Sequence, residues 1–154
     1  MFKKKPFYLW CLTAAAALAV LAWHIYPRDM ADLMVIPEDI SVNAMYWETE
    51  RSCISQEWEA GSPEAEQVWE LLHGTQYSKG IGLLMPLLDP EYLTDRSYQD
   101  GAVVLVLEDG QGEKYLVAFF RKHMNYTPPE GLLRSYLIPH ESGMREKLAE
   151  MITA

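Results

Sequence analysis

The residues with metal-binding chemistry are few and widely separated in this sequence. Beyond the N-terminal region they are Cys53, His73, His123 and His140. A zinc site needs such ligands at i, i+4 spacing on a helix or close together in a short loop. No pair has that spacing, so we expect no metal site and predict that all three histidines lie at the surface.

Motifs for nucleophilic catalysis and phosphate binding are absent. The sequence contains no Gly-x-Ser-x-Gly turn, and Cys53 has no histidine near it along the chain. Gly80-Ile81-Gly82 is too short for a phosphate-binding loop. Carboxylate pairs are common, but a chain with 22 acidic residues contains such pairs by chance. We therefore expect no catalytic residues and no cofactor.

Acidic residues form two groups of potential cation ligands. These are Asp89, Glu91, Asp95 and Asp100 in one segment, and Glu108 and Asp109 at a second turn. Calcium takes about six to eight oxygen ligands from a shaped loop, and the EF-hand spacing is missing here. We interpret residues 89–100 as a solvated acidic loop, with a weak cation site as the alternative.

Aromatic residues are frequent enough to line a groove for a peptide or a glycan. They are Trp47, Trp58, Trp69, Tyr77, Tyr92, Tyr98, Tyr115, Tyr126 and Tyr136. The same rings can form the core of a small domain, which is the interpretation that we favour. Tyr92 in the acidic loop and Tyr126 beside Pro128-Pro129 are the candidates for exposed rings, because loops carry most binding function. Together with Tyr98 they are the predicted binding residues.

The elements that position these residues begin with two short strands. Residues 40–46 alternate apolar and polar side chains, which predicts a half-buried strand with Tyr46 among its inward residues. Residues 52–58 can return as a second strand, with either Cys53 or the pair Ile54 and Trp58 pointing inward. We expect Cys53 to be buried, and an intermolecular disulfide is the alternative.

A helix is predicted over Pro63–His73. Ser62 is suited to cap its first amides, proline favours the first helical position, and Gly74 favours its end. A second helix is predicted near the C-terminus, with Ser142 as its cap. Each has apolar residues at helical spacing on one side.

Further strands are predicted between the two helices. Residues 102–108 and 114–121 flank Asp109-Gly110-Gln111-Gly112, whose glycines suit a tight hairpin. Residues 81–88 form a short or edge strand, residues 125–131 a loop, and residues 132–138 a final strand. Because short turns pair strands antiparallel, the expected fold class is α+β, with a small antiparallel sheet and two helices packed on one of its faces.

The N-terminal region predicts a membrane anchor. Phe7–Tyr26 comprises 20 residues without Asp, Glu, Lys or Arg, and a helix of that length spans about 30 Å of hydrocarbon. Lys3–Lys5 favour a cytoplasmic N-terminus. Trp10 and Trp23 lie near opposite ends of the run, as in the aromatic belts of a spanning helix. A cleaved signal peptide, cut after Ala22 or Ala19, is the first alternative, and a buried helix of a soluble protein is the second.

The expected organisation is therefore a cytoplasmic tail (1–6), a transmembrane signal-anchor helix (7–26), a tether (27–37) and an extracytoplasmic domain (38–154). All 22 acidic residues and 10 of the 13 basic residues lie beyond the anchor, so that part carries a formal charge of about −12. Such a charge argues against nucleic acid as a partner, because nucleic acid binding needs basic patches.

The layout resembles a loose group of small, uncharacterised, membrane-anchored proteins of Gram-positive bacteria. The residues that carry the resemblance are Lys3–Lys5, Ser62-Pro63-Glu64, Leu71-Leu72, Tyr77 and Asp109-Gly110. It implies a location and a fold, and it brings no catalytic residues. We expect a non-catalytic interaction domain held at the cell membrane, with the lipid bilayer and an envelope protein as partners. The alternatives are a sensor or carrier domain for a small ligand, peptide or cell-wall fragment, and a secreted hydrolase.

Overall fold

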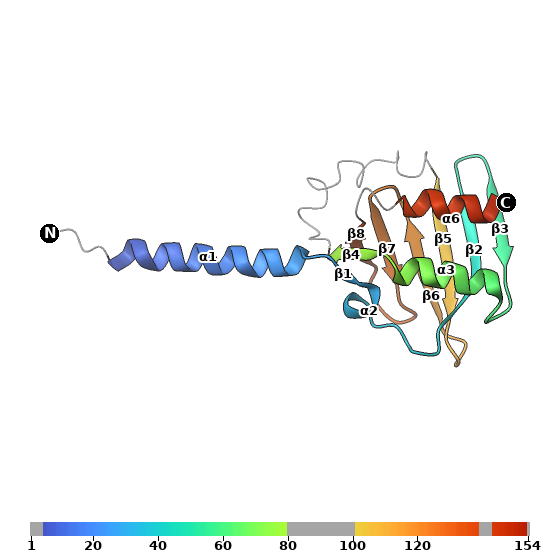
Figure 1. Cartoon of the computed structure of the whole chain (residues 1–154), viewed down its shortest axis with the longest axis horizontal. Coiled ribbons are helices and arrows are strands. Elements are labelled where there is room, and N and C mark those ends of the chain that lie inside the picture. The colour runs from blue at the N-terminus through green and yellow to red at the C-terminus, as the bar shows by residue number, and fades with distance from the viewer. Residues whose placement is uncertain (1–4, 80–100, 139–142, 154) are drawn as a thin grey trace.

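An N-terminal helix leads into an α+β domain in this computed structural model, which describes residues 5–79, 101–138 and 143–153 (Figure 1). Helix α1 (Lys5–Ile25) contains an 18-residue apolar stretch, Tyr8–Ile25, of which nothing is buried inside the protein. By length and composition it could cross a membrane, and a signal sequence would have the same properties. Residues 81–88, 89–100 and 139–142, with Tyr92, Tyr98, His140 and the Ser142 cap, lie outside the described residues.

Within the described residues the domain is one antiparallel sheet of eight strands in the order β1-β4-β8-β7-β6-β5-β2-β3. The strands are β1 (Arg28–Asp29), β2 (Ser41–Glu48), β3 (Cys53–Glu57), β4 (Gln76–Lys79), β5 (Ala102–Glu108), β6 (Lys114–Phe119), β7 (His123–Thr127) and β8 (Arg134–Leu137). The expected α+β class and antiparallel sheet are confirmed.

Helices α3 (Pro63–His73) and α6 (Met144–Thr153) lie side by side across one face of this sheet (Figure 1). Strand register brings Met45, Leu105, Val117 and Tyr126 into one row across four neighbouring strands. Val68 of α3 and Leu148 of α6 belong to the same buried cluster as that row. The core therefore lies between the helices and this face.

The N-terminal end of α3 forms as its sequence predicts. The hydroxyl of Ser62 accepts a hydrogen bond from the Ala65 amide at 3.3 Å, and Pro63 occupies the first helical position. The first amides of a helix have no backbone partner within it. Ser62 supplies a partner for one of them, and Pro63 has no amide hydrogen that needs one. The helix bounds match the predicted Pro63–His73.

A β-bulge in β2 changes which side chains point inward. The pairing with β5 shifts between Val42 and Ala44, so that Asn43 is the extra residue. Beyond the bulge the alternation is reversed, and Met45 becomes fully buried while Tyr46 is only half-buried. The prediction that Tyr46 points into the core is therefore wrong, because simple alternation does not anticipate an inserted residue.

Strand β3 lies at the edge of the sheet and leaves Cys53 exposed, so the predicted burial of Cys53 is wrong. Ile54 pairs with Trp47, and this register turns Ile54 and Trp58 toward the helix-covered face and Cys53 toward the opposite face. Trp58 packs against the core, whereas Ile54 is still 41% exposed. An edge strand has a neighbour on one side only, which leaves its side chains partly uncovered.

The segment predicted as a tether is part of the folded domain. Strand β1 pairs with β4, and the short helix α2 (Met30–Leu33) follows it directly. Met30, Leu33 and Met34 are buried in the core cluster. These apolar residues lie among acids in the sequence and form no long periodic pattern, so their burial was not predicted. Only Tyr26 and Pro27 separate α1 from β1.

Two further strands were not predicted. Strand β4 follows α3 after two residues, and β7 occupies part of the segment that we predicted as a loop. The hairpin of β5 and β6 is confirmed, as are β8 and the C-terminal helix α6. Both missed strands are short and lie beside Gly, Pro or charged residues, which weakens any alternation signal.

Candidate functional site

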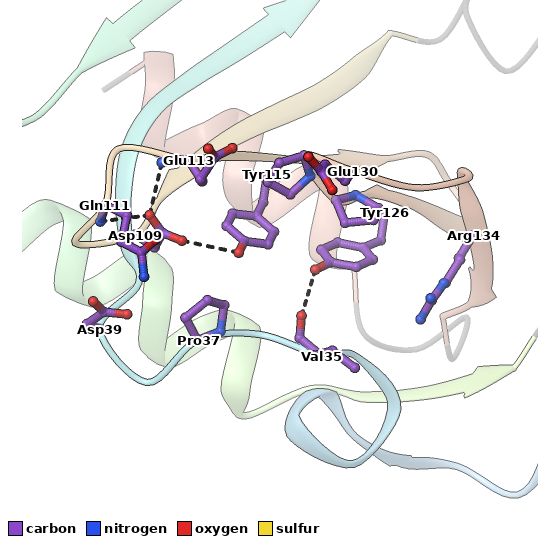
Figure 2. A pocket seen from close by; sticks show the side chains of 12 residues that line it. Val35, Pro37, Asp39, Asp109, Gln111, Glu113, Tyr115, Tyr126, Glu130 and Arg134 are labelled. Atoms are coloured by element: carbon purple, nitrogen blue, oxygen red, sulfur yellow. Dashed lines mark hydrogen bonds between the residues drawn. The ribbon is translucent and has the colours of Figure 1, made fainter.

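A cavity of about 550 Å³ opens where three separate segments of the chain meet (Figure 2). The segments are the connection between α2 and β2, the turn between β5 and β6, and the connection between β7 and β8. The residues that line the cavity are Val35, Pro37, Asp39, Asp109, Gln111, Glu113, Tyr115, Tyr126, Pro128, Pro129, Glu130 and Arg134.

Asp109 organises the turn at one end of the cavity. One carboxylate oxygen accepts hydrogen bonds from the amides of Gln111 and Glu113, each at 2.9 Å. The other accepts from the Tyr115 hydroxyl at 3.2 Å. Desolvation by itself raises the pKa of the Asp109 carboxyl, but these hydrogen bonds outweigh it and hold the pKa below its ordinary value. Asp109 is therefore a structural anion with its hydrogen-bonding capacity largely used.

Asp39 joins the α2–β2 connection to the same turn. Its carboxylate accepts a hydrogen bond from the Gly110 amide at 3.1 Å. A Cβ atom at position 110 would collide with that carboxylate, so a larger residue there would displace the Asp39 side chain. The glycine that we interpreted as a hairpin residue thus also holds one wall of the cavity in place.

Two tyrosines form the base of the cavity. The rings of Tyr115 and Tyr126 stack with centroids 6.3 Å apart and an interplanar angle of 14°. The Tyr126 hydroxyl donates to the Val35 carbonyl at 2.9 Å, and the Tyr136 hydroxyl donates to the Leu33 carbonyl at 3.2 Å (Figure 2 shows the first bond). These bonds hold the segment after α1 against the sheet.

The prediction that the Tyr126 ring is exposed is wrong, because it is only 1% exposed. Tyr126 lies on a strand that was predicted as a loop, and its side chain points to the helix-covered face. Burial raises its pKa to about 12. Tyr126 does line the cavity, whereas Tyr92 and Tyr98 lie outside the described residues.

Negative charge dominates the lining. Among the described lining residues there are four carboxylates, from Asp39, Asp109, Glu113 and Glu130, and one cation, Arg134. Desolvation raises the pKa of the Tyr115 phenol, and the nearby carboxylates of Asp109, Glu113 and Asp39 raise it further. Three carboxylates therefore surround one phenol at this end of the cavity.

The lining is suited to binding. Among the described residues it contains no histidine, cysteine, serine or lysine, and its ionisable side chains are carboxylates, tyrosines and one arginine. No group of three or more His, Cys, Asp or Glu side chains in the described part of the chain has the arrangement of a metal site. The chemistry available is hydrogen bonding, apolar contact and charge.

The residues singled out by their chemistry lie elsewhere. His73 is exposed at the end of α3, with its ring 4.4 Å from that of Trp69. His123 is only 3% exposed, and its ring stacks on Phe120 at 4.5 Å, so its predicted surface position is wrong. The error has the same origin as for Tyr126, because both residues belong to the unpredicted strand β7.

Most of the described aromatic residues belong to the core, as we favoured. Tyr77 is fully buried and its hydroxyl donates to the Leu72 carbonyl at 3.0 Å. Trp47, Trp58 and Trp69 are partly buried and pack against the core cluster.

Three parts of the cavity carry separate signals in the sequence: the turn at Asp109, the Pro128-Pro129 loop and Tyr126. Asp39, Glu113 and Arg134 were not predicted as site residues, since a lone charged residue in an acidic chain carries no signal of its own. Geometry is the basis for inferring what this site does, since no family model, curated protein or solved structure matches this chain.

Proposed function

We propose that this protein is a non-catalytic binding protein, held in the cell membrane by α1, whose extracytoplasmic domain takes a ligand in the cavity at Tyr115 and Tyr126. The cavity is the observation that carries the proposal. Binding sites for small molecules have volumes of roughly 300–1,000 Å³ and combine apolar walls with a few polar groups. A small ligand, a short peptide or a cell-wall fragment would fit that description.

The properties of α1 support the anchor. Its apolar side chains, including Leu9, Leu12 and Leu18, are exposed along its length. Fully burying a side chain of this size contributes about 1.5–3 kcal/mol, so a bilayer would stabilise this helix strongly relative to water. The three lysines at its N-terminal side favour an orientation with the domain outside the cytoplasm.

A protein partner in the envelope is a second candidate, favoured by the edge strand β3. The Trp58 amide donates to the Asn43 carbonyl at 2.9 Å, which assigns the even-numbered residues of β3 to the ladder with β2. The backbone groups of Cys53, Ser55 and Glu57 therefore face outward. No described strand covers that edge, and an extended segment of a partner could add there as a further strand.

A cavity-filling substitution tests the proposed site. Full-length protein in phosphatidylcholine nanodiscs is screened against a panel of short peptides and soluble cell-wall fragments by saturation-transfer NMR. Val35→Trp places a large ring at a cavity-lining position that is 79% exposed, so it blocks the cavity without disturbing the core. We expect ligands found with the unmodified protein to lose at least about tenfold in affinity, equivalent to about 1.4 kcal/mol.

Leu132→Trp is the matched control, because Leu132 is 86% exposed and does not line the cavity. Ligands that bind Val35→Trp as well as they bind the control would show that the cavity is not the site. If no peptide or cell-wall fragment in the panel binds the unmodified protein, the proposed function is contradicted.

A further inference from the structure

Two of the charges in the cavity have no counter-charge among the described residues. Asp109 uses both carboxylate oxygens in hydrogen bonds, and Asp39 accepts one from Gly110. The carboxylates of Glu113 and Glu130, in contrast, accept no hydrogen bond and form no ion pair with any described residue. Arg134 lines the same cavity without an ion pair to either of them. Two carboxylates are thus available to a ligand.

The apolar part of the lining lies beside these carboxylates. Pro37, Pro128, Pro129 and Val35 supply walls without hydrogen-bond donors, and Tyr115 lies between Asp109 and Tyr126 at the base (Figure 2). Carboxylates that can accept hydrogen bonds, next to apolar surface, match a ligand with an alkyl stem and a cationic head. Hydrogen bonds between a cation and a carboxylate are also stronger than those between neutral groups.

An anionic or a neutral ligand fits less well. Four carboxylates against one guanidinium repel an anion, and a neutral ligand would gain no attraction from the exposed charges of Glu113 and Glu130. A bare metal ion is not favoured either, since the described acidic residues form no cluster that could hold one.

From this charge complementarity we infer that the ligand, if the proposed site is correct, carries an ammonium or guanidinium group on an alkyl stem and directs it to Glu113 and Glu130. The stem contacts the prolines and Tyr115. Such a group has two sources with the same chemistry: a lysine or arginine side chain of a peptide, and a free alkyl amine. The inference rests on the proposed function and adds the chemical class of the ligand.

Matched probes test the sign of the charge. Acetyl-Gly-Lys-Gly-amide, its norleucine and glutamate counterparts, and putrescine are titrated into full-length protein in phosphatidylcholine nanodiscs, with NMR detection. We expect the lysine peptide, putrescine or both to bind at least about tenfold more tightly than the norleucine and glutamate peptides, and more weakly at high salt. Preference for the lysine peptide over putrescine identifies a peptide source, and the reverse preference identifies a free amine.

The double variant Glu113→Gln with Glu130→Gln should lose at least about tenfold in affinity for the bound cation. Its control, Glu70→Gln with Glu150→Gln, removes the same net charge from exposed helix positions that do not line the cavity. Equal losses in both variants would overturn the inference, because the attraction would then belong to the acidic protein as a whole. The inference would also be overturned if neither the lysine peptide nor putrescine binds.

The two proposals fail in different ways. If the norleucine peptide binds as tightly as the lysine peptide and Val35→Trp abolishes both, the inferred charge is wrong while the cavity stands as a binding site. If cations bind equally to Val35→Trp and to the unmodified protein, the site itself is wrong.

Discussion

Individual tyrosines connect the cavity to the rest of the fold. Tyr126 donates its hydroxyl proton to Val35 across 91 residues of sequence, and Tyr136 donates to Leu33 across 103 residues. Each phenol fixes a carbonyl of the segment that follows α1, so the position of the cavity wall depends on a few hydroxyl groups. Two buried tyrosines, of which Tyr126 was predicted as exposed, thus hold the cavity-lining segment.

The first prediction concerns Tyr126 and pH. Tyr126→Phe removes the bond to Val35 and should lower the free energy of unfolding by about 0.5–1.5 kcal/mol at neutral pH. Because burial raises the pKa of Tyr126 from 10.0 to about 12, the folded state keeps the phenol proton more tightly than the unfolded state. Its contribution is therefore complete below pH 10 and falls as the pH rises from about 10 to about 12.

Chemical unfolding of the full-length protein in detergent, at pH 7 and at pH 11, measures both effects. The variant should lose less stability between these pH values than the unmodified protein. Tyr46→Phe is the control, since Tyr46 is half-buried on the other face. Identical pH dependence in the unmodified protein and Tyr126→Phe would contradict the assignment.

At the scale of elements, the decisive difference from expectation is the segment from Arg28 to Met34. It pairs with β4, buries three apolar side chains and continues into the cavity wall. Only Tyr26 and Pro27 separate this segment from α1, so the proposed anchor connects to the cavity wall through β1 and α2. The domain therefore begins at β1, about ten residues earlier than the sequence predicts.

Substitution in this segment distinguishes a folded element from a tether. Met30→Ala removes a fully buried side chain and should destabilise the domain by about 2–5 kcal/mol. Val35→Ala, at a position that is 79% exposed, should change stability by less than about 0.5 kcal/mol. Chemical unfolding followed by tryptophan fluorescence measures both. Equal stability of the two variants would mean that the segment contributes nothing to the core.

At the scale of the whole molecule, Arg28 joins the domain to α1. Its guanidinium donates to the Trp23 carbonyl at 2.8 Å and lies 4.5 Å from the Trp23 ring centroid.

The exposed cysteine of β3 is a natural reporter for the proposed topology. Cys53 lies on the edge strand at the far end of the sheet from β1 (Figure 1), and Cys11 lies in α1. Only Cys53 is within an aqueous domain if α1 spans the membrane.

In intact cells, a membrane-impermeant maleimide should therefore label the unmodified protein and fail to label Cys53→Ser. Alkaline extraction should leave the full-length chain in the membrane. Labelling that requires lysis of the cells would overturn the orientation. Release of a chain that begins near Trp23 would show instead that α1 is a cleaved signal peptide.

Local patterns carried much of the prediction. The apolar run, the cap at Ser62 and the glycine turn after Asp109 each depend on residues within one turn or one helix, so the sequence alone determined α1, α3, the β5–β6 hairpin and the α+β class. The order of the strands and their register depend on contacts between distant segments. For that reason the bulge at Asn43, the edge position of Cys53 and the strand that contains His123 and Tyr126 were not predicted.

The cavity was decided by the tertiary structure. Its walls come from segments near Asp39, Asp109 and Glu130, which are far apart in the sequence. The Gly110–Asp39 bond spans 71 residues, and contacts of that range form only when the sheet brings both ends together. The sequence determined that the domain is strongly acidic. The fold determined which of its many carboxylates line a common cavity.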